Sequence, residues 1–281
     1  MENSMKITNL FGKFTRRSYL AMMSGLVVSC LVAPANAADD NPYGLLDTDS
    51  IMVGTMSDAK PYAFVTADGT FSGFDVEFFQ NIAKRLGFEK DQVTFVGQDF
   101  AALIPSVVNG RFDVAVGAIG TTAQRQKVAD FTDGYLAGFL SVLSSDESLS
   151  TIEALDDKRL GIVQGTLQDD YAQKHFPKAQ LVRFPDNNSA VAALNNGMVD
   201  AHFLDFEAAK QFGKNYPGLK VMQNFASFDA PAGFVVRKGN SRLLDALNEK
   251  IHEAMQDGTW KELHSKWFPG SPMPKQYLPQ N

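Results

Sequence analysis

Apolar and polar residues alternate in short blocks that predict strands followed by helices. Residues 51–56 (IMVGTM) are typical of a short buried strand. The stretch at 69–75 (GTFSGFD) predicts a turn and a second strand that ends at Asp75, a residue suited to cap a helix. Apolar residues then recur at helical spacing from Phe79 to Leu86. The first third of the chain therefore reads as strand, strand, helix.

The same order continues through most of the chain. Further strands are predicted at 93–98, 112–118, 159–166, 180–184 and 199–205. Further helices are predicted at 102–110, 169–176 and 187–197, with two amphipathic helices from 241 to about 268. Strands alternating with helices favour an α/β fold with a largely parallel sheet.

One arginine lies where a cation is not expected. Residues 113–131 begin as a buried strand and continue as an amphipathic helix, which Thr121 and Gln124 would cap from about Thr122. Arg125 then lies in the first turn, where the helix dipole disfavours positive charge. It is either a solvated surface charge or a partner for an anion, because free amides at a helix start and a planar guanidinium together suit a carboxylate.

The two halves of the chain resemble each other. Residues 109–113 (NGRFD) and 196–200 (NGMVD) match in spacing, and each closes a helix before opening a strand. With the strand order also recurring, we predict two similar α/β lobes on a hinge. Two crossings should join them, near 139–145 and 221–228.

The predicted lobes are discontinuous in sequence. The first lobe comprises 50–141 together with 226–281, and the second comprises 142–225. Residues 38–49 would be an N-terminal extension, and residues 1–37 precede the folded part.

Residues 1–37 have the features of a cleaved secretory signal. A basic start is followed by an apolar run over 19–32 and by APANA, which supplies an A-x-A cleavage site. TRRSYL within it is similar to a twin-arginine export signal. An alternative is lipidation at Cys30, although the sequence after it is not a polar tether.

Cleavage would change the chemistry that is available. It removes the only cysteine, together with four basic residues and one acidic residue, so the net charge goes from −6 to −9. The remaining 244 residues carry no thiol and no histidine pair at metal-ligand spacing, so we expect neither disulfides nor a metal site, and no cofactor. The acidic balance disfavours a nucleic-acid partner, and no later stretch is apolar enough to span a bilayer.

Asp205 is the second unusual charge. It ends the apolar strand AHFLD, where a partly buried carboxylate needs a partner. A ligand ammonium, a salt bridge or a capping role would each satisfy it. With Arg125 in one lobe and Asp205 in the other, the pair matches a zwitterion bound between the lobes. Thr166, in the glycine turn QGT, could also donate to the ligand carboxylate.

Catalytic signatures are missing from the sequence. There is no G-x-S-x-G elbow, phosphate-binding loop or H-E-x-x-H motif. Glu207, two residues past Asp205, could act as an acid or a base in a cleft, but a solvated carboxylate is the commoner role.

With these residues in view, the chain resembles a known family: the periplasmic solute-binding proteins of polar amino-acid ABC transporters, solute-binding family 3, with the type II periplasmic binding fold. The resemblance runs from about residue 50 to 268. It rests on five stretches in the family's order, at 73–88, 99–135, 161–166, 199–205 and 235–268.

The resemblance implies a role for each site residue. The residues implied at the ligand carboxylate are Arg125, Thr166 and Gly165. Those implied at the ammonium group are Asp205, Ala118 and Gly120. Those implied around the ligand side chain are Phe100, Tyr62, Met56, Ala59 and Thr122. The family also implies a monomer that delivers its ligand to an ABC permease and ATPase.

Three positions depart from the family pattern. Gly120 stands where the family usually has serine or threonine, so a hydroxyl for the ammonium group is missing. Met56 and Ala59 replace the acidic and aromatic residues typical of members that bind basic or amide side chains. Those ligands are therefore disfavoured, and Gly120→Ser is expected to leave binding intact. The same fold also occurs in periplasmic cyclohexadienyl (arogenate or prephenate) dehydratases. Those enzymes need a carboxylic acid in the cleft, and the spacing of Glu207 from Asp205 differs by one residue from the spacing expected for that acid.

Overall fold

A computed structural model describes residues 40–227 and 230–279 of the chain. The predicted signal, its twin-arginine motif and Cys30 lie outside these described residues. Within the described ranges, no helix combines the length and the apolar character needed to cross a membrane.

The first lobe is built on a five-stranded sheet in the order β5-β1-β6-β13-β7. Its strands are β1 (Ile51–Thr55), β5 (Val93–Gly97), β6 (Val114–Ala115), β7 (Ala129–Phe131) and β13 (Val235–Arg237). β1 pairs in parallel with β5 and β6, whereas β13 pairs antiparallel with β6 and β7. A small sheet of β2 (Asp58–Ala59), β3 (Ala63–Val65) and β4 (Phe71–Ser72) precedes the first helix.

The second lobe repeats this arrangement, with the strand order β10-β9-β11-β8-β12. Its strands are β8 (Phe139–Ser144), β9 (Arg159–Val163), β10 (Gln180–Phe184), β11 (Ala201–Asp205) and β12 (Lys220–Ala226). β9 pairs in parallel with β10 and β11, and β8 pairs antiparallel with β11 and β12. The expected α/β class is confirmed, but each sheet is mixed rather than largely parallel. Parallel pairs need a helical crossover, and β8 and β13, which enter their sheets from the other lobe without one, pair antiparallel with both of their neighbours.

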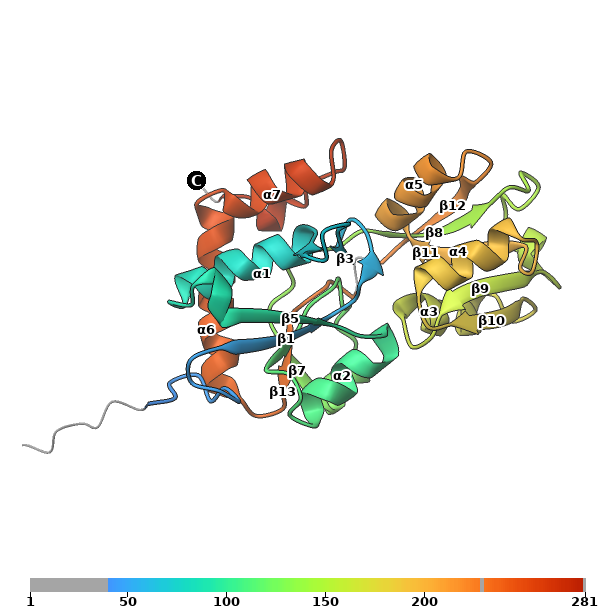
Figure 1. Cartoon of the computed structure of the whole chain (residues 1–281). Coiled ribbons are helices and arrows are strands. Elements are labelled where there is room, and N and C mark those ends of the chain that lie inside the picture. The colour runs from blue at the N-terminus through green and yellow to red at the C-terminus, as the bar shows by residue number, and fades with distance from the viewer. Residues whose placement is uncertain (1–39, 228–229, 280–281) are drawn as a thin grey trace, which may run out of the picture. The chain divides into compact units, whose positions relative to one another are not determined.

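Seven α-helices are described in these ranges, and they cover both faces of the sheets (Figure 1). They are α1 (Phe74–Arg85), α2 (Phe100–Val108), α3 (Leu167–His175), α4 (Asn187–Asn195), α5 (Phe206–Asn215), α6 (Ser241–Gln256) and α7 (Thr259–Trp267). α1, α6 and α7 pack together, while α2 lies on the sheet strands β1, β6 and β13. In the second lobe, α3 packs against β9 and β11.

Aromatic side chains fill the core of the first lobe. Phe74, Phe78, Tyr135, Phe234 and Trp260 are each fully buried, and their rings lie 4.6–6.5 Å apart in successive pairs. The indole N–H of Trp260 donates to the carbonyl of Tyr135 at 2.8 Å. This bond ties α7 to the segment that leads into β8, so the C-terminal helices support the floor of the cleft.

The expected N-cap role of Asp75 is wrong. α1 begins one residue earlier, after Gly73, whose φ of +128° and close approach to the carbonyl of Tyr62 leave no room for a Cβ. Asp75 therefore lies inside the first turn, fully buried. Its Oδ1 accepts from the backbone N–H groups of Gly117 (3.2 Å) and Ala118 (2.9 Å) and from the hydroxyl of Tyr135.

The α-helix expected after Thr122 is also wrong. The chain forms only a 3₁₀ turn, Arg125–Lys127, before β7 begins at Ala129. Gln124 occupies the cap position without a side-chain bond, and the Oγ1 of Thr122 accepts from the N–H of Arg125 at 3.2 Å. Only Val128 separates this turn from β7, which leaves no space for an α-helix, so Arg125 lies at a turn rather than at a helix start.

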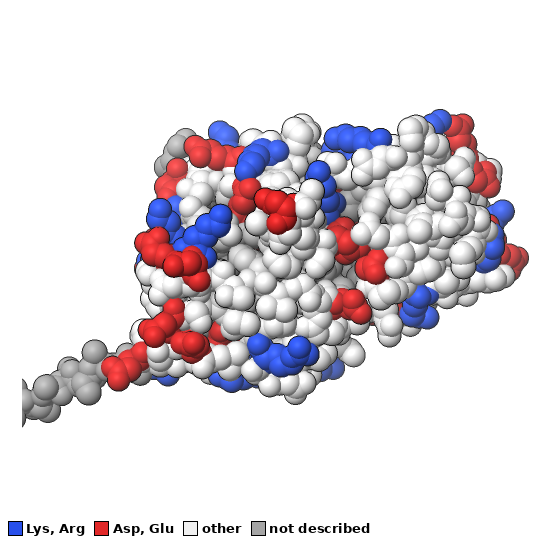
Figure 2. All heavy atoms as spheres, in the orientation of Figure 1, with Lys and Arg blue, Asp and Glu red and all other residues white. Residues whose placement is uncertain are grey.

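Charged side chains of both signs are spread over the surface. On the face drawn in Figure 2, acidic and basic residues are interspersed among larger uncharged areas.

Candidate functional site

Two neighbouring cavities lie at the carboxyl ends of the strands, where residues of both lobes meet. The smaller has a volume of about 40 Å³, and the larger about 530 Å³. Eight of the predicted site residues line the smaller cavity: Met56, Ala59, Tyr62, Phe100, Ala118, Gly120, Thr166 and Asp205. The structure thus brings these eight predicted residues together around one cavity, whereas Arg125, Gly165 and Thr122 are not part of its lining.

Arg125 is a buried cation held by neutral groups. Its side chain leaves the residue 8% exposed, and its guanidinium donates from Nη1 to the carbonyl of Gly120 (2.6 Å) and from Nη2 to the carbonyl of Gly165 (2.8 Å). The group lies 5.3 Å from the ring centre of Phe100. Within the described ranges it forms no salt bridge. Burial lowers the pKa of Arg125, with the charge of Asp170 opposing that shift.

Gly165 and Thr166 bring the second lobe to this arginine. Gly165 has a φ of +74°, which turns the chain between β9 and α3 and presents its carbonyl to Arg125. Thr166 is the N-cap of α3: its Oγ1 accepts from the N–H of Asp169 at 3.2 Å and donates to the carbonyl of Val163 at 2.7 Å. Its hydroxyl is thus committed to the helix start in this arrangement.

Further contacts join the lobes beside the cleft. The Oδ2 of Asp58, in the first lobe, accepts from the backbone N–H of Asn188 at the start of α4, at 3.0 Å. Ser271, near the C-terminus, donates to Oε1 of Glu207 on α5. Together with the bond from Arg125 to Gly165, these contacts hold the two lobes against each other.

Ala118 and Gly120 line both cavities. Ala118 has a φ of +51°, a backbone conformation that residues with a side chain seldom adopt. The buried carboxylate of Asp75 holds this turn through the N–H groups of residues 117 and 118. Sequence reasoning missed this supporting role, since nothing near Asp75 in sequence indicates a partner more than forty residues away.

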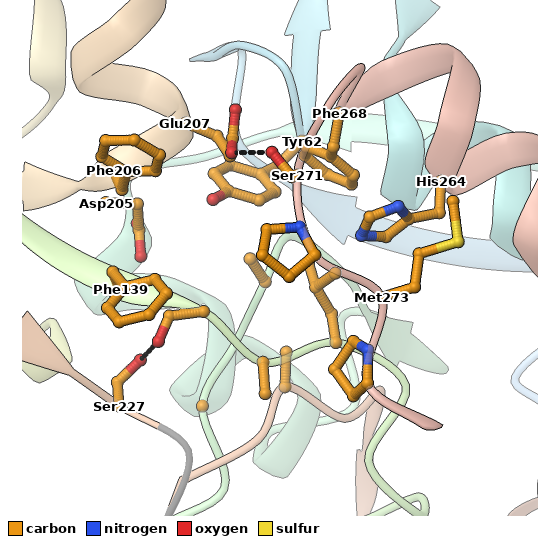
Figure 3. Close-up of a pocket in the computed structure, with 18 of the residues that line it drawn as sticks. Tyr62, Phe139, Asp205, Phe206, Glu207, Ser227, His264, Phe268, Ser271 and Met273 are labelled. Atoms are coloured by element: carbon orange, nitrogen blue, oxygen red, sulfur yellow. Dashed lines mark hydrogen bonds between the residues drawn. The ribbon is translucent and has the colours of Figure 1, made fainter. Parts of the chain in front are cut away.

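Asp205 ends β11 and lies at the N-cap position of α5, without a side-chain bond to the helix. Burial raises its pKa from 3.8 to about 6, a hydrogen bond from Gln168 opposes the rise, and Asp75 adds to it. Its carboxylate lines both cavities (Figure 3). A partly buried carboxylate with a raised pKa is a group that a ligand cation would stabilise.

The predicted side-chain pocket is mostly assembled. Met56, Ala59, Tyr62 and Phe100 line the small cavity, and Phe100 also packs against the Arg125 guanidinium. Thr122 is not among the residues that line either cavity, and its hydroxyl contacts the backbone of Arg125 instead.

Leu167 is a site residue that the sequence did not indicate. Its side chain fills the space beside Gly120, where a Cβ would lie 2.4 Å from Leu167 Cδ1 and 3.1 Å from the carbonyl of Ala230. Leu167 and Gly120 both line the two cavities. The glycine therefore makes room for the leucine, which stands between the two chambers.

This contact changes the expectation for Gly120→Ser. We now expect the serine to weaken ligand binding by roughly tenfold, because overpacking costs about 1–3 kcal/mol and here falls on the contact between the lobes. Adding Leu167→Ala should recover most of that loss, as measured by calorimetric titration of both single variants and the double variant. Wild-type affinity in Gly120→Ser alone would mean that Leu167 does not occupy this space when ligand is bound.

Glu207 is not arranged as a free acid. Its Oε2 accepts from Lys210 Nζ at 3.0 Å and its Oε1 from Ser271. Both carboxylate oxygens are thus taken by neighbouring side chains, which argues against the dehydratase role considered for it. Among the residues that the structure describes, no cluster of His, Cys, Asp or Glu is placed to hold a metal ion.

Two α/β lobes with a polar cleft at their strand ends define a class of ligand-capturing proteins. Residues 51–270 match the family model for bacterial extracellular solute-binding proteins, family 3, and the chain belongs to this family. The resemblance seen in the sequence is thereby confirmed.

Individual relatives of the chain agree with this family assignment. The chain is 27% identical to the ABC transporter arginine-binding protein 1 of Escherichia coli K12, over 88% of this chain and all of that protein. It is 30% identical to the histidine-binding periplasmic protein of the same organism, over 78% and 87% of the two chains. Among solved structures, an ancestral arginine-binding protein bound to glutamine superposes with a TM-score of 0.74 at 31% identity, covering 78% of this chain and 98% of that one. These relatives are binding proteins rather than enzymes.

Proposed function

We propose that this protein captures an α-amino acid, or a related small zwitterion, between its lobes and delivers it to the permease and ATPase of an ABC importer. The observation that carries the proposal is Arg125: a buried guanidinium between the lobes whose hydrogen-bond acceptors, among the residues that the structure describes, are two backbone carbonyls. A ligand carboxylate would replace those neutral acceptors with a charged one that the planar guanidinium can bind with two parallel hydrogen bonds. Asp205 supplies the opposite charge for an ammonium group.

The remaining roles follow from position. Gly165 and Thr166 would support the carboxylate, and the backbone at Ala118 and Gly120 the ammonium group. Phe100, Tyr62, Met56 and Ala59 would surround the first atoms of the ligand side chain. Met56 and Ala59 offer neither an acid nor an aromatic ring. We therefore expect basic and amide amino acids to bind less well to this protein than the names of its relatives suggest.

The cellular setting is also part of the proposal. The basic, apolar and A-x-A segments of residues 1–37 favour export and cleavage, and TRRSYL favours the twin-arginine route. The mature protein would act as a periplasmic monomer whose lobes, divided near residues 141 and 226, close on the ligand. Ligand would shift an existing equilibrium between open and closed forms.

A thermal-shift screen tests the function directly. The purified protein is heated with each amino acid, with simple amines and with organic acids. A ligand at a hundred times its Kd stabilises by about 2.7 kcal/mol, which for a chain of this size raises Tm by about 5–10 °C. We expect such shifts only from compounds that carry both an α-carboxylate and an α-ammonium group. Shifts from amines or from acids alone would contradict the zwitterion assignment, and arginine and histidine test the predicted selectivity.

A further inference from the structure

The larger cavity has a wall that the family match does not include. The matched region ends at residue 270, yet Ser271, Met273 and the other residues up to Gln276 line the cavity of about 530 Å³. The rest of its wall comes from the start of α5, from α7 and from the segments that enter β8 and leave β12 (Figure 3). The C-terminal segment 271–276 thus forms one wall of the chamber and lies beyond the matched region.

The C-terminal segment is held firmly at both sides. Tyr277 is 3% exposed, and its ring lies 5.2 Å from that of Trp260 on α7. Ser271 reaches across to Glu207 on α5. Because this segment contacts an element of each lobe, the wall is part of the fold in the arrangement seen here.

The chamber is mainly apolar. Its wall includes Leu136, Phe139, Phe206, Phe268 and Met273. Glu207 is already occupied by Lys210 and Ser271. His264 is 3% exposed, and its Nδ1 has no hydrogen-bond partner among the described residues. A volume of this size with an apolar wall and few polar groups is typical of a small-molecule site.

The chamber adjoins the proposed ligand site. Tyr62, Ala118, Gly120, Leu167 and Asp205 line both cavities. The smaller cavity has room for little more than two or three water-sized probes. A ligand whose ammonium group lies at Asp205 finds open space on the side of the C-terminal segment, because the larger cavity shares Asp205 with the smaller one. A third cavity of about 440 Å³ shares Met56 and Phe100 with the smaller cavity but is not lined by Asp205.

We propose that the chamber enclosed by residues 271–276 binds the side chain of the ligand, and that this side chain is long and largely apolar. The inference rests on the proposed function and names the ligand class within it: α-amino acids with extended hydrocarbon side chains. The open space beyond Leu167 accommodates several methylene groups, and the apolar wall removes them from water.

Calorimetric titration with a homologous series tests the proposal. The probes are L-2-aminobutanoate, L-norleucine and L-2-aminooctanoate. Each buried methylene should increase affinity about three- to fourfold, so the longest should bind about a hundredfold tighter than the shortest. Binding of 2-aminobutanoate with equal or weaker binding of 2-aminooctanoate would overturn the chamber assignment alone. If no compound of the series or of the amino-acid panel bound, the proposed function would fall with it.

A variant that fills the chamber with a larger side chain tests the assignment against a matched control. Gly138 lines the chamber, and a Cβ there meets no atom within 4 Å. Gly138→Leu should abolish the gain for 2-aminooctanoate while leaving 2-aminobutanoate within about threefold. Gly218→Leu, the same change at an exposed glycine that also has open space, should leave the whole series unaltered.

A second filling variant separates occupancy of the chamber from an effect on lobe closure. Met273→Trp places a larger side chain on the C-terminal segment, which is a different part of the chain from the segment that leads into β8. Loss of the chain-length gain in both variants supports the proposal. An unchanged gain in both, or an equal loss for short and long ligands in both, would overturn it.

Discussion

Replacing Arg125 with alanine should weaken ligand binding by about a thousandfold while the protein still folds. A hydrogen bond to a charged group contributes about 1.5–3 kcal/mol, and a guanidinium that grips a carboxylate makes two. Removing one partner of a buried ion pair costs about 3–5 kcal/mol, because the other charge is left uncompensated. Arg125→Lys should also lose at least about tenfold, since an ammonium group keeps the charge but not the planar fork. Titration calorimetry with the tightest ligand measures both losses.

The matched control is Lys127→Ala. Lys127 belongs to the same 3₁₀ turn and is exposed, so its removal changes the net charge equally without entering the cleft. We expect its affinity to stay within about twofold of wild type. Melting curves without ligand check that the variant folds. We expect it to fold, because the Gly120 and Gly165 carbonyls that Arg125→Ala leaves free can bind water. Tight binding by a folded Arg125→Ala protein would refute the carboxylate assignment.

Long buried strands were the part of the fold that the sequence could predict. Runs such as 51–55, 159–163 and 201–205 are apolar, β-branched in part and bounded by turn residues, and they fold as strands. β6, β7 and β13 contain only two or three residues each. Such lengths show no periodicity, so the mixed character of the first sheet could not be read from the chain.

The site residues also divide into those that the sequence could indicate and those that it could not. Arg125 and Asp205 could be singled out because each charge conflicts with its surroundings: Asp205 ends an apolar strand, and Arg125 lies in the first turn of the expected helix, where the dipole disfavours a cation. Leu167 gave no such conflict, since a leucine after a glycine turn is typical of a helix that faces the core. Its role depends on Gly120, forty-seven residues earlier, and became visible only when the structure placed the two side by side. Asp75 misled for a similar reason: an aspartate at a helix start usually caps it.

Lowering the pH from 7.5 to 5 should weaken ligand binding about tenfold through Asp205. Burial raises the pKa of this carboxyl from 3.8 to about 6, so in the free protein it takes up a proton as the pH falls through 6. Because the carboxyl pKa is higher in the folded protein than in the unfolded chain, ionisation of Asp205 lowers the free energy of unfolding above pH 6. This loss of stability disappears as the pH falls towards 4. A ligand ammonium needs the ionised form. Affinity should therefore be flat above about pH 7 and decline towards tenfold per pH unit below 5.5.

Other ionisable groups near Asp205 require controls. Burial raises the pKa of Asp75 to about 6 as well, and burial lowers the pKa of His264 below 6.5. Tyr62 and Glu207 lie close, but burial raises the tyrosine pKa far above this range. Asp75→Asn and His264→Gln should therefore keep the decline, whereas Asp205→Asn should bind at least about a hundredfold more weakly and lose the pH dependence. A decline that persists in Asp205→Asn would assign the proton to another group.

Proton release identifies the charged partner independently of affinity. At pH 6 about half of the free protein carries a proton on Asp205, and an ammonium ligand must displace it. Titrations in buffers of different ionisation enthalpy should therefore detect about half a proton released per ligand at pH 6 and almost none at pH 8. A ligand held only by its carboxylate would release no proton from Asp205 at either pH. The measurement thus separates a zwitterion bound at both ends from an acid bound by Arg125 alone, which the affinity of the Arg125 variants cannot do.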